Sequence, residues 1–199
     1  MATNTMADIF SKNQYDLKVA ARKSKDWFQQ QALLLGKQNI TPQRVLKEKP
    51  DHSKAGIIPG HMYMFLYDAK HKDTLQYWDR FPLVFPYKKT AKGFIGLNMH
   101  YLPYQMRIIL LDRLMQFKNN DRMDETTKLK YSWATIGGMT RFKAAEPCIH
   151  EYLIGHVKSS FKKIDANDWT TALLLPVELF VGANKNTAWS ESRKRITSV

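Results

Sequence analysis

The sequence predicts an α+β fold in which a small antiparallel sheet packs against about three helices. Three apolar, aromatic-rich runs follow one another between residues 61 and 102, each bounded by charged or glycine-containing connectors. This pattern is typical of a compact antiparallel β unit. Apolar residues then recur at three- and four-residue spacing over 103–164, as on helices that bury one face. Residues 168–182 are again apolar and strand-like, which favours one α+β domain over two separate domains.

The composition indicates one domain with a sizeable core and an anionic partner. Of the 199 residues, 44% are hydrophobic and 12% are aromatic. The net charge of +13 favours nucleic acid first, and an acidic protein or membrane surface second, although dispersed lysines also simply solvate a protein. Cys148 is the only cysteine, which suits a reducing cytoplasm. No apolar run is long enough to cross a bilayer.

Residues 1–60 are interpreted as an extended helical N-terminal arm, because apolar residues are sparse there and lysines are frequent. A helix is predicted over 16–35. Thr41-Pro42 favours the start of a second, short helix, since a capping hydroxyl precedes a proline at the first helical position. Residues 51–60 form a linker. The arm is expected to pack on a neighbour or to wrap the domain.

The β unit at 61–102 is predicted to be a small curved sheet or an SH3-like barrel. Its first strand spans 62–67 and is followed by a charged turn at 68–73. The segment 74–78 is a candidate to pair back with that strand. Together these elements would make a rigid platform.

The next two strands contain prolines and glycines that bear on their positions. Because proline cannot donate a ladder hydrogen bond, the strand at 81–87, with Pro82 and Pro86, is predicted to lie at an edge or to carry a bulge. Glycines bracket the third strand, which is expected to run from 93 to 102 and to curve the sheet.

Three helices are predicted after the sheet. The first opens at Pro103 and ends near residue 118. The second spans 124–136 and stops at Gly137-Gly138. The third opens at Pro147, and its apolar residues fall four apart: Ile149, Leu153, Val157 and Phe161.

The C-terminal part is predicted to complete the sheet and then to leave the domain. Residues 168–182 are apolar enough for a buried closing strand. Residues 183–199 form a polar, basic tail that is expected to fray or to bind a partner. The chain thus divides into an arm (1–60), an α+β core (61–182) and this tail.

Candidate catalytic and metal-binding groups are weak, so we expect no enzyme activity, no catalytic residue, no metal ligand and no cofactor. His150 and His156 are six residues apart, whereas two histidines on a helix face one ion at a spacing of four. Cys148 next to a proline could be an activated thiol, but a packed cysteine is the better interpretation. Three carboxylates within twelve residues suit a two-metal nuclease and equally a solvated hairpin: Asp68, Asp73 and Asp79.

Rings and cations interleave in and after the β unit, as on surfaces that stack bases and neutralise phosphates. The alternative is that the rings fill the core while the lysines face water. The candidate phosphate contacts are Lys88, Lys89, Lys92, Lys158, Lys162 and Lys163. The candidate rings for stacking on a terminal base pair are Trp78 and Tyr87.

Several motifs resemble a known family. They are Tyr67-Asp68-Ala69-Lys70, Tyr77-Trp78-Asp79-Arg80-Phe81-Pro82, Gly93-Phe94-Ile95-Gly96-Leu97-Asn98, Leu110-Leu111-Asp112, Pro147-Cys148-Ile149 and His156-Val157-Lys158-Ser159. With them the chain resembles the small virion-associated proteins of T-even-type, contractile-tailed phages. The resemblance covers roughly residues 61–180, and the arm matches only loosely.

The resemblance implies a non-enzymatic role in the phage virion. Our first hypothesis is a structural component of the neck, tail or baseplate, whose arm and tail dock onto other virion proteins. The alternative is a protein that binds double-stranded DNA and protects packaged DNA ends from host nucleases. Either protein would be made in the host cytoplasm and located in the virion, with no membrane and no small-molecule substrate as partner.

Overall fold

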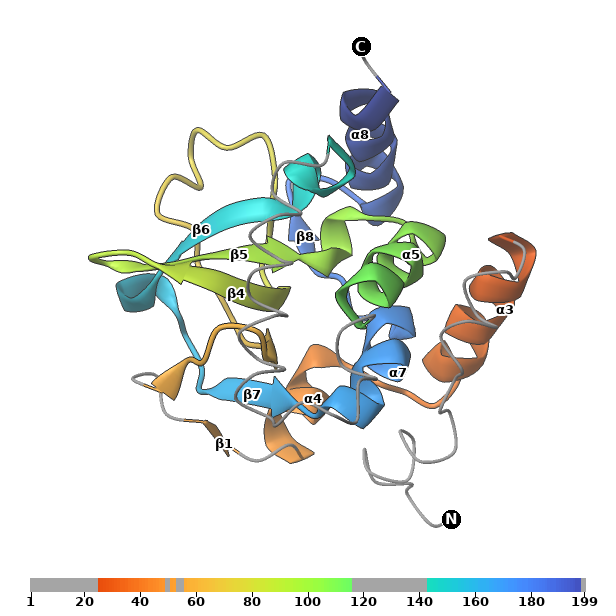
Figure 1. Ribbon diagram of the computed structural model, residues 1–199, viewed down its shortest axis with the longest axis horizontal. Coiled ribbons are helices and arrows are strands. Elements are labelled where there is room, and N and C mark those ends of the chain that lie inside the picture. The colour runs from red at the N-terminus through yellow and green to blue at the C-terminus, as the bar shows by residue number, and fades with distance from the viewer. Residues whose placement is uncertain (1–24, 49–50, 53–55, 116–142, 198–199) are drawn as a thin grey trace.

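The computed structural model describes residues 25–48, 51–52, 56–115 and 143–197, which form an open six-stranded antiparallel sheet with helices beside it (Figure 1). A second sheet has two strands, β3 and β8. In the order of the main sheet the strands are β1 (Asp51–His52), β7 (Phe161–Ile164), β2 (Met62–Met64), β4 (Leu83–Lys89), β5 (Gly93–Asn98) and β6 (Ile149–Leu153). The α+β prediction is confirmed, and the described strands make a sheet that is not closed into a barrel.

The helices gather on one side of the main sheet, with α8 at its upper end in Figure 1. The α-helices are α3 (Lys25–Gly36), α4 (Pro42–Glu48), α5 (Tyr104–Met115), α7 (Trp169–Leu174) and α8 (Lys185–Thr197). Short 3-10 turns are η2 (Met99–Tyr101), η3 (Lys143–Cys148), η4 (Ile154–His156) and η5 (Ala166–Asp168). None of the described helices combines the length and hydropathy that a membrane span needs.

The described part of the predicted arm packs on the domain. Phe28 and Leu35 of α3 and Val45 of α4 are at most 1% exposed and join the main core. The short helix begins as predicted, since the Thr41 hydroxyl accepts a hydrogen bond from the backbone N–H of Arg44 at 3.2 Å. These helices therefore pack on the protein's own core.

The two faces of the main sheet bury different side chains. Along β2, Met62 and Met64 face the helices, whereas Tyr63 faces the other way. The helix side is the larger, mainly aliphatic core. The opposite side is a cluster rich in rings, which includes Tyr63, Phe65, Tyr67, Trp78, Phe94, Tyr152 and Phe161. Alternation in the strands thus creates a second, aromatic core.

The proline-containing strand is central and bulged. β4 lies between β2 and β5, so the edge position predicted for it is wrong. Its register against β5 shifts between Pro86 and Lys88, which confirms the predicted bulge. The Pro86 carbonyl still accepts a hydrogen bond from the backbone N–H of Gly60 at 3.1 Å. A bulge therefore lets the strand stay inside the sheet although Pro86 has no N–H to donate.

The helix predicted at Pro147 is wrong. Ile149 and Leu153 belong to β6, which pairs with β5, and Phe161 belongs to β7, which pairs with β2. Residues four apart share one face of a helix, but they also share one face of a strand, where the period is two. The spacing was therefore compatible with both structures, and pairing to β5 decided between them.

The predicted C-terminal strand and frayed tail are also wrong. Residues 169–174 form α7, which is buried throughout, and a short run that is apolar on all sides does not distinguish helix from strand. The segment 74–78 does not pair with β2; β3 (Trp78–Asp79) pairs with β8 (Phe180–Val181) instead. The tail is the helix α8, anchored by buried Trp189. The predicted helix at 124–136 lies outside the described residues.

A buried ion pair joins α5 to η2, to α7 and to the segment before β8. Arg107 of α5 is 0% exposed. Its guanidinium donates to the carbonyls of Leu102 (2.6 Å), Leu173 (2.9 Å) and His100 (3.3 Å), and to the carboxylate of Glu178 (2.5 Å). Burial alone would raise the pKa of Glu178, but the Arg107 charge, together with smaller contributions from His100 and Lys185, outweighs burial and holds the pKa below its usual range.

We predict that Glu178→Ala lowers the free energy of unfolding by about 3–5 kcal/mol, because it leaves a buried guanidinium without its counter-charge. Urea denaturation at pH 7 measures this change. Lys72→Ala is the matched control, since its pair with Asp68 at 3.2 Å is exposed and should contribute under about 1 kcal/mol. Equal effects of the two substitutions would contradict the prediction.

We also predict that Gly93→Ala destabilises the protein by about 1–3 kcal/mol, because a Cβ there would overlap the carbonyl oxygen of Tyr152 in β6. Thermal unfolding should show a lower Tm, by about 2–12 °C. Gly155→Ala is the control, because a Cβ at Gly155 meets no atom within 4 Å. A Gly93→Ala protein as stable as Gly155→Ala would show that the two strands separate easily.

Candidate functional site

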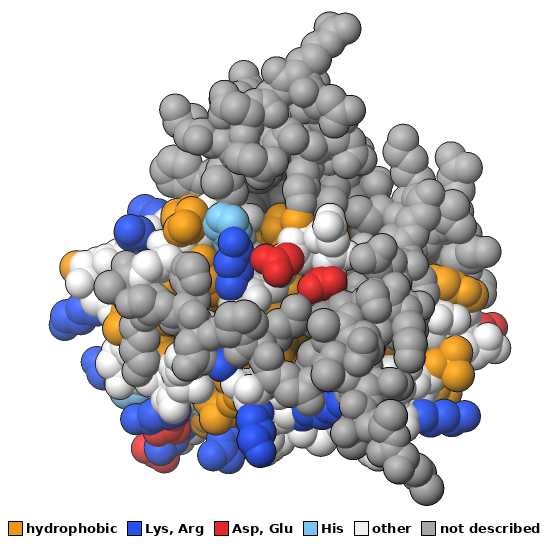
Figure 2. All heavy atoms as spheres, turned by 90° about the horizontal axis from the view of Figure 1, so that it is seen from below, with side chains coloured by type: hydrophobic (Ala, Val, Ile, Leu, Met, Phe, Trp, Pro, Cys, Tyr) orange, Lys and Arg blue, Asp and Glu red, His pale blue; other side chains and the backbone are white. Residues whose placement is uncertain are grey.

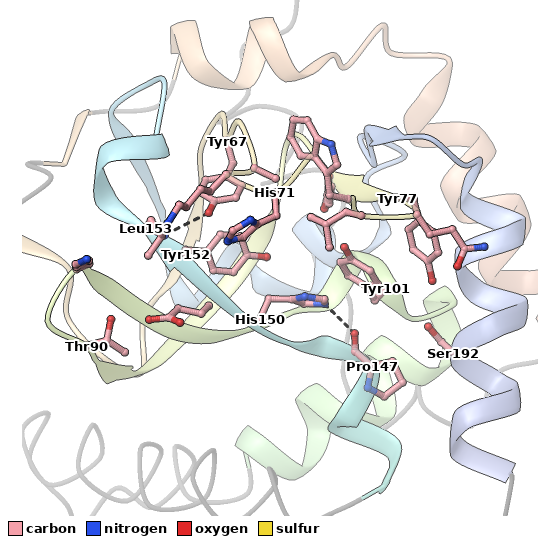
Figure 3. Close-up of a pocket in the computed structure, with 18 of the residues that line it drawn as sticks. Tyr67, His71, Tyr77, Thr90, Tyr101, Pro147, His150, Tyr152, Leu153 and Ser192 are labelled. Carbon is pink, nitrogen blue, oxygen red and sulfur yellow. Dashed lines mark hydrogen bonds between the residues drawn. The ribbon is translucent and has the colours of Figure 1, made fainter. Parts of the chain in front are cut away.

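An open cleft of about 800 Å³ lies on the aromatic side of the main sheet (Figure 3). Six segments line it: the loop 67–79, the tip of the β4–β5 hairpin at 90–92, η2 through Tyr101, η3 through Pro147, strand β6, and α8. The β4–β5 hairpin is closed at its tip by a hydrogen bond from the N–H of Thr90 to the carbonyl of Gly93 at 2.9 Å. Segments far apart in the sequence therefore build the cleft.

The wall of the cleft is a row of rings. Tyr77 stacks on Tyr101 with ring centroids 6.0 Å apart at 29°, and Tyr101 meets His150 at 4.1 Å and 30°. Tyr67 and Tyr152 continue the wall as an edge-to-face pair at 5.0 Å. His150 comes from β6 and points into the cleft because it alternates with Ile149, which faces the helices.

Hydrogen bonds fix these rings in place. The Tyr67 hydroxyl accepts from the N–H of Leu153 at 3.3 Å. His150 Nε2 lies 2.9 Å from the carbonyl oxygen of Pro147, and since a carbonyl only accepts, this nitrogen carries the proton. Both bonds are drawn in Figure 3. The ring wall is thus preorganised before anything binds.

The wall is uncharged at neutral pH. Burial lowers the pKa of His150 to about 4, so the imidazole is neutral at pH 7. Burial, with the nearby Glu191, raises the pKa of Tyr77 to about 12. Burial also raises the pKa of Tyr101 far above its ordinary value. The rings therefore offer neutral faces, which suit stacking better than ion pairing.

The charges that line the cleft are mainly basic. Lys70 on the loop, Lys92 on the hairpin and Arg195 on α8 are all exposed. Glu151 is the exposed carboxylate among the lining residues. Asp79 also lines the cleft, but it is 3% exposed and engaged in a buried network. The accessible charge favours an anionic ligand.

The network around Asp79 supports the floor of the cleft. Its carboxylate accepts from His100 Nδ1 (2.8 Å) and Asn98 Nδ2 (3.0 Å), and from the backbone N–H of Phe81 (3.0 Å). Burial would raise the pKa of Asp79, but His100 and these donors together lower it. An Asp–His pair is also a catalytic arrangement, but here His100 is 0% exposed and its imidazole does not line the cleft.

The residues first considered for catalysis do not meet. Asp68 pairs with Lys72 and Asp73 is exposed in the turn, while Asp79 is buried beside His100. His156 Nδ1 donates to the carbonyl of Asp68 at 2.9 Å. No group of three potential metal-ligating side chains occurs within the described ranges.

Cys148 is a packed core residue, as predicted. The residue is 0% exposed, and burial raises the pKa of its thiol far above its ordinary value. A buried, protonated thiol is a poor nucleophile.

The structure divides the predicted nucleic-acid-binding residues among separate places. Lys92 and Trp78 both line the cleft, although Trp78 is only 8% exposed. Lys88 and Lys89 are exposed on the same hairpin, outside the cleft lining, beside half-buried Tyr87. On the other side of the 67–79 loop, Lys158 is exposed near Arg80. On β7 Lys162 is 5% exposed and Lys163 is half-buried, and their role in DNA contact stays a prediction.

Sequence reasoning missed several residues of the cleft. Arg195 was placed in a frayed tail, and His150 was placed on a helix. In a strand, residues two apart lie on the same face. Had 149–153 been recognised as a strand, this period would have placed His150 and Tyr152 together on one face. No local sequence pattern could predict that α8 and β6 would line the same cleft.

One comparison with known proteins gives a match. The model of a family described as phage T4 terminal DNA protecting protein matches residues 4–195. No curated protein and no solved structure matches the chain. The matched region includes the arm, the core and α8 together.

We predict that protein stability falls as the pH drops from about 6.5 towards 4. The unfolded chain binds a proton at His150 near pH 6.5, whereas the folded protein does so only near pH 4. Because the ring keeps some contact with solvent, we expect this residue to account for about 1–2 kcal/mol between pH 7 and pH 5. Urea denaturation at the two pH values measures it.

His150→Gln should reduce this pH dependence by the stated amount. His71→Gln, which changes an exposed histidine at the same cleft, should leave it unchanged. An unaltered pH dependence in His150→Gln would show that the ring titrates normally.

Proposed function

Because the chain belongs to the phage T4 terminal DNA protecting protein family, we propose that it binds the ends of linear double-stranded DNA and shields them from exonucleases. The family match over residues 4–195 is the observation that carries this proposal. DNA end protection was our alternative hypothesis from the sequence, and the family match now favours it over docking onto other virion proteins.

The charge of the chain supports a DNA partner. A protein with a net charge of +13 attracts phosphates over its whole surface. Figure 2 shows the described Lys and Arg side chains spread over one face, mostly near its margin, rather than gathered in one patch. Such a distribution suits contacts with the backbone, which position a protein without reading base sequence.

Two basic elements border the cleft. The β4–β5 hairpin carries exposed Lys88, Lys89 and Lys92, and α8 carries three exposed cations. The cations of α8 are Arg193, Lys194 and Arg195. Lys92 and Arg195 both line the cleft, so it opens between the two elements. This arrangement lets phosphates of both strands at a DNA end approach the protein at once.

Docking onto other virion proteins is a second proposed function, which one observation favours. On α3, Leu33 is 67% exposed and Leu34 is 49% exposed, although the helix packs its other side on the core. Adjacent exposed leucines suit an interface with another protein. We propose that the protein is made in the host cytoplasm and occupies the virion, where DNA ends and neighbouring proteins are both present.

We predict that the purified protein slows exonuclease digestion of linear duplex DNA and binds it more tightly than closed circular DNA. Affinity should fall by about 10³ or more between 50 and 200 mM salt if six phosphate contacts form. Fluorescence anisotropy and a digestion time course measure these two properties. Equal affinity for linear and circular DNA, with no protection, would refute the proposal.

Changing the hairpin tests the placement of the DNA. Lys88→Ala combined with Lys89→Ala should weaken binding and reduce the slope of log affinity against log salt by about 2. Lys37→Ala combined with Lys47→Ala removes two exposed lysines from the α3–α4 region and is the control. The control should bind almost as tightly as the unmodified protein.

A further inference from the structure

We propose that the cleft holds an unpaired terminal nucleotide of a DNA strand, with its base on the ring wall and its phosphate between Lys92 and Arg195. This inference rests on the proposed DNA end binding and names the part of the DNA that the cleft recognises. Capturing the last nucleotide would bury the phosphodiester at which an exonuclease starts.

The ring wall provides the stacking surface. Tyr101 is buried in the middle of the row, whereas Tyr77 and His150 on its two sides are half-buried and line the cleft. Figure 3 shows the three rings from three different elements, with His150 held towards Pro147. Stacking of one base on an aromatic side chain contributes about a 5- to 150-fold gain in affinity, without regard to base identity.

The polar groups are arranged to take the sugar and phosphate. Lys92 and Arg195 provide cations from the hairpin and from α8. On the hairpin, two residues before Lys92, the Thr90 hydroxyl oxygen is buried and has no hydrogen-bond partner among the described residues. A buried hydroxyl without a partner is unfavourable, and a ligand oxygen in the cleft would satisfy it. Glu151 can accept a hydrogen bond from an exocyclic amine of a base.

The size of the cleft and the neutrality of its ring wall select an unpaired nucleotide. A volume of about 800 Å³ lies within the usual range for small-ligand sites, about 300–1,000 Å³. A base inside a duplex exposes no face to a protein ring, and the base of a blunt terminal pair exposes one face but must unpair, at a cost of a few kcal/mol, before it can enter the cleft alone, whereas an overhanging base is already unpaired. Because His150 and Tyr77 are neutral at pH 7, a base can stack on them without competing with a bound counter-ion. The protein should therefore prefer ends with an overhang.

Binding to duplexes that differ only at the end tests this inference. We expect a duplex with a one- to three-nucleotide overhang, at the 3′ or the 5′ end, to bind more tightly than the blunt duplex of the same length. Tyr77→Ala should remove about 5- to 150-fold of affinity for the overhang and so reduce the ratio of overhang affinity to blunt-end affinity. Tyr77→Phe keeps the ring and should keep the preference.

Tyr87→Ala is the matched control, because Tyr87 is a half-buried tyrosine near the hairpin that does not line the cleft. It should keep the overhang preference. Photo-crosslinking of a terminal 5-iododeoxyuridine in the unmodified protein gives a second test that needs no folded variant. Crosslinks at Tyr77, Tyr101 or His150 are expected.

The outcomes separate this inference from the proposed function. Protection of linear DNA with equal binding of blunt and overhanging ends, or with crosslinks outside the cleft, would overturn the nucleotide site alone. Failure to distinguish linear from circular DNA would overturn both. Free deoxynucleoside monophosphate at millimolar concentration should compete with the overhang and not with the blunt end, which distinguishes nucleotide recognition from general phosphate binding.

Discussion

The buried guanidinium of Arg107 is the contact on which the arrangement of the domain depends. It reaches the 3-10 turn η2, the helix α7 and the segment before β8 through His100, Leu173 and Glu178. The ring of Trp189 in α8 lies 5.4 Å from the same guanidinium, and its indole N–H donates to the carbonyl of His100 at 2.9 Å. Because a charge with no exposed surface must have all its donors satisfied, these segments have little freedom to move apart.

This constraint extends to the cleft. The turn that gives its backbone carbonyl to Arg107 also contributes Tyr101 to the ring wall and the imidazole of His100 to Asp79. The hydrogen bonds around Asp79 hold Asn98 of β5 and the backbone at Phe81, two residues before β4. The buried Arg107 guanidinium is thus connected, through His100 and the adjacent Tyr101, to the neutral rings that line the cleft.

The two faces of the main sheet bury different side chains, and this difference explains why one small domain can have both a core and an open aromatic site. Mainly aliphatic side chains meet the helices, while the rings on the opposite face pack on one another. Edge-to-face pairs such as Phe65 with Tyr152, with centroids 5.4 Å apart, stabilise that cluster from within. Tyr67 and Tyr152 of that cluster line the cleft together with Tyr77, which packs against the main core, and with His150.

The sequence by itself determined the α+β class, the glycine- and proline-marked strands of the β unit, the helix after Pro103 and the basic character, because these follow from local residue properties and short spacings. Tertiary structure alone decided that 149–153 is a strand, since a spacing of four fits both periods until β5 pairs with it. It likewise decided that residues 185–197 form a helix, which Trp189 anchors in the core. The cleft belongs to this second group, because Lys92, His150 and Arg195 are distant in the chain and meet only through long-range pairing and packing.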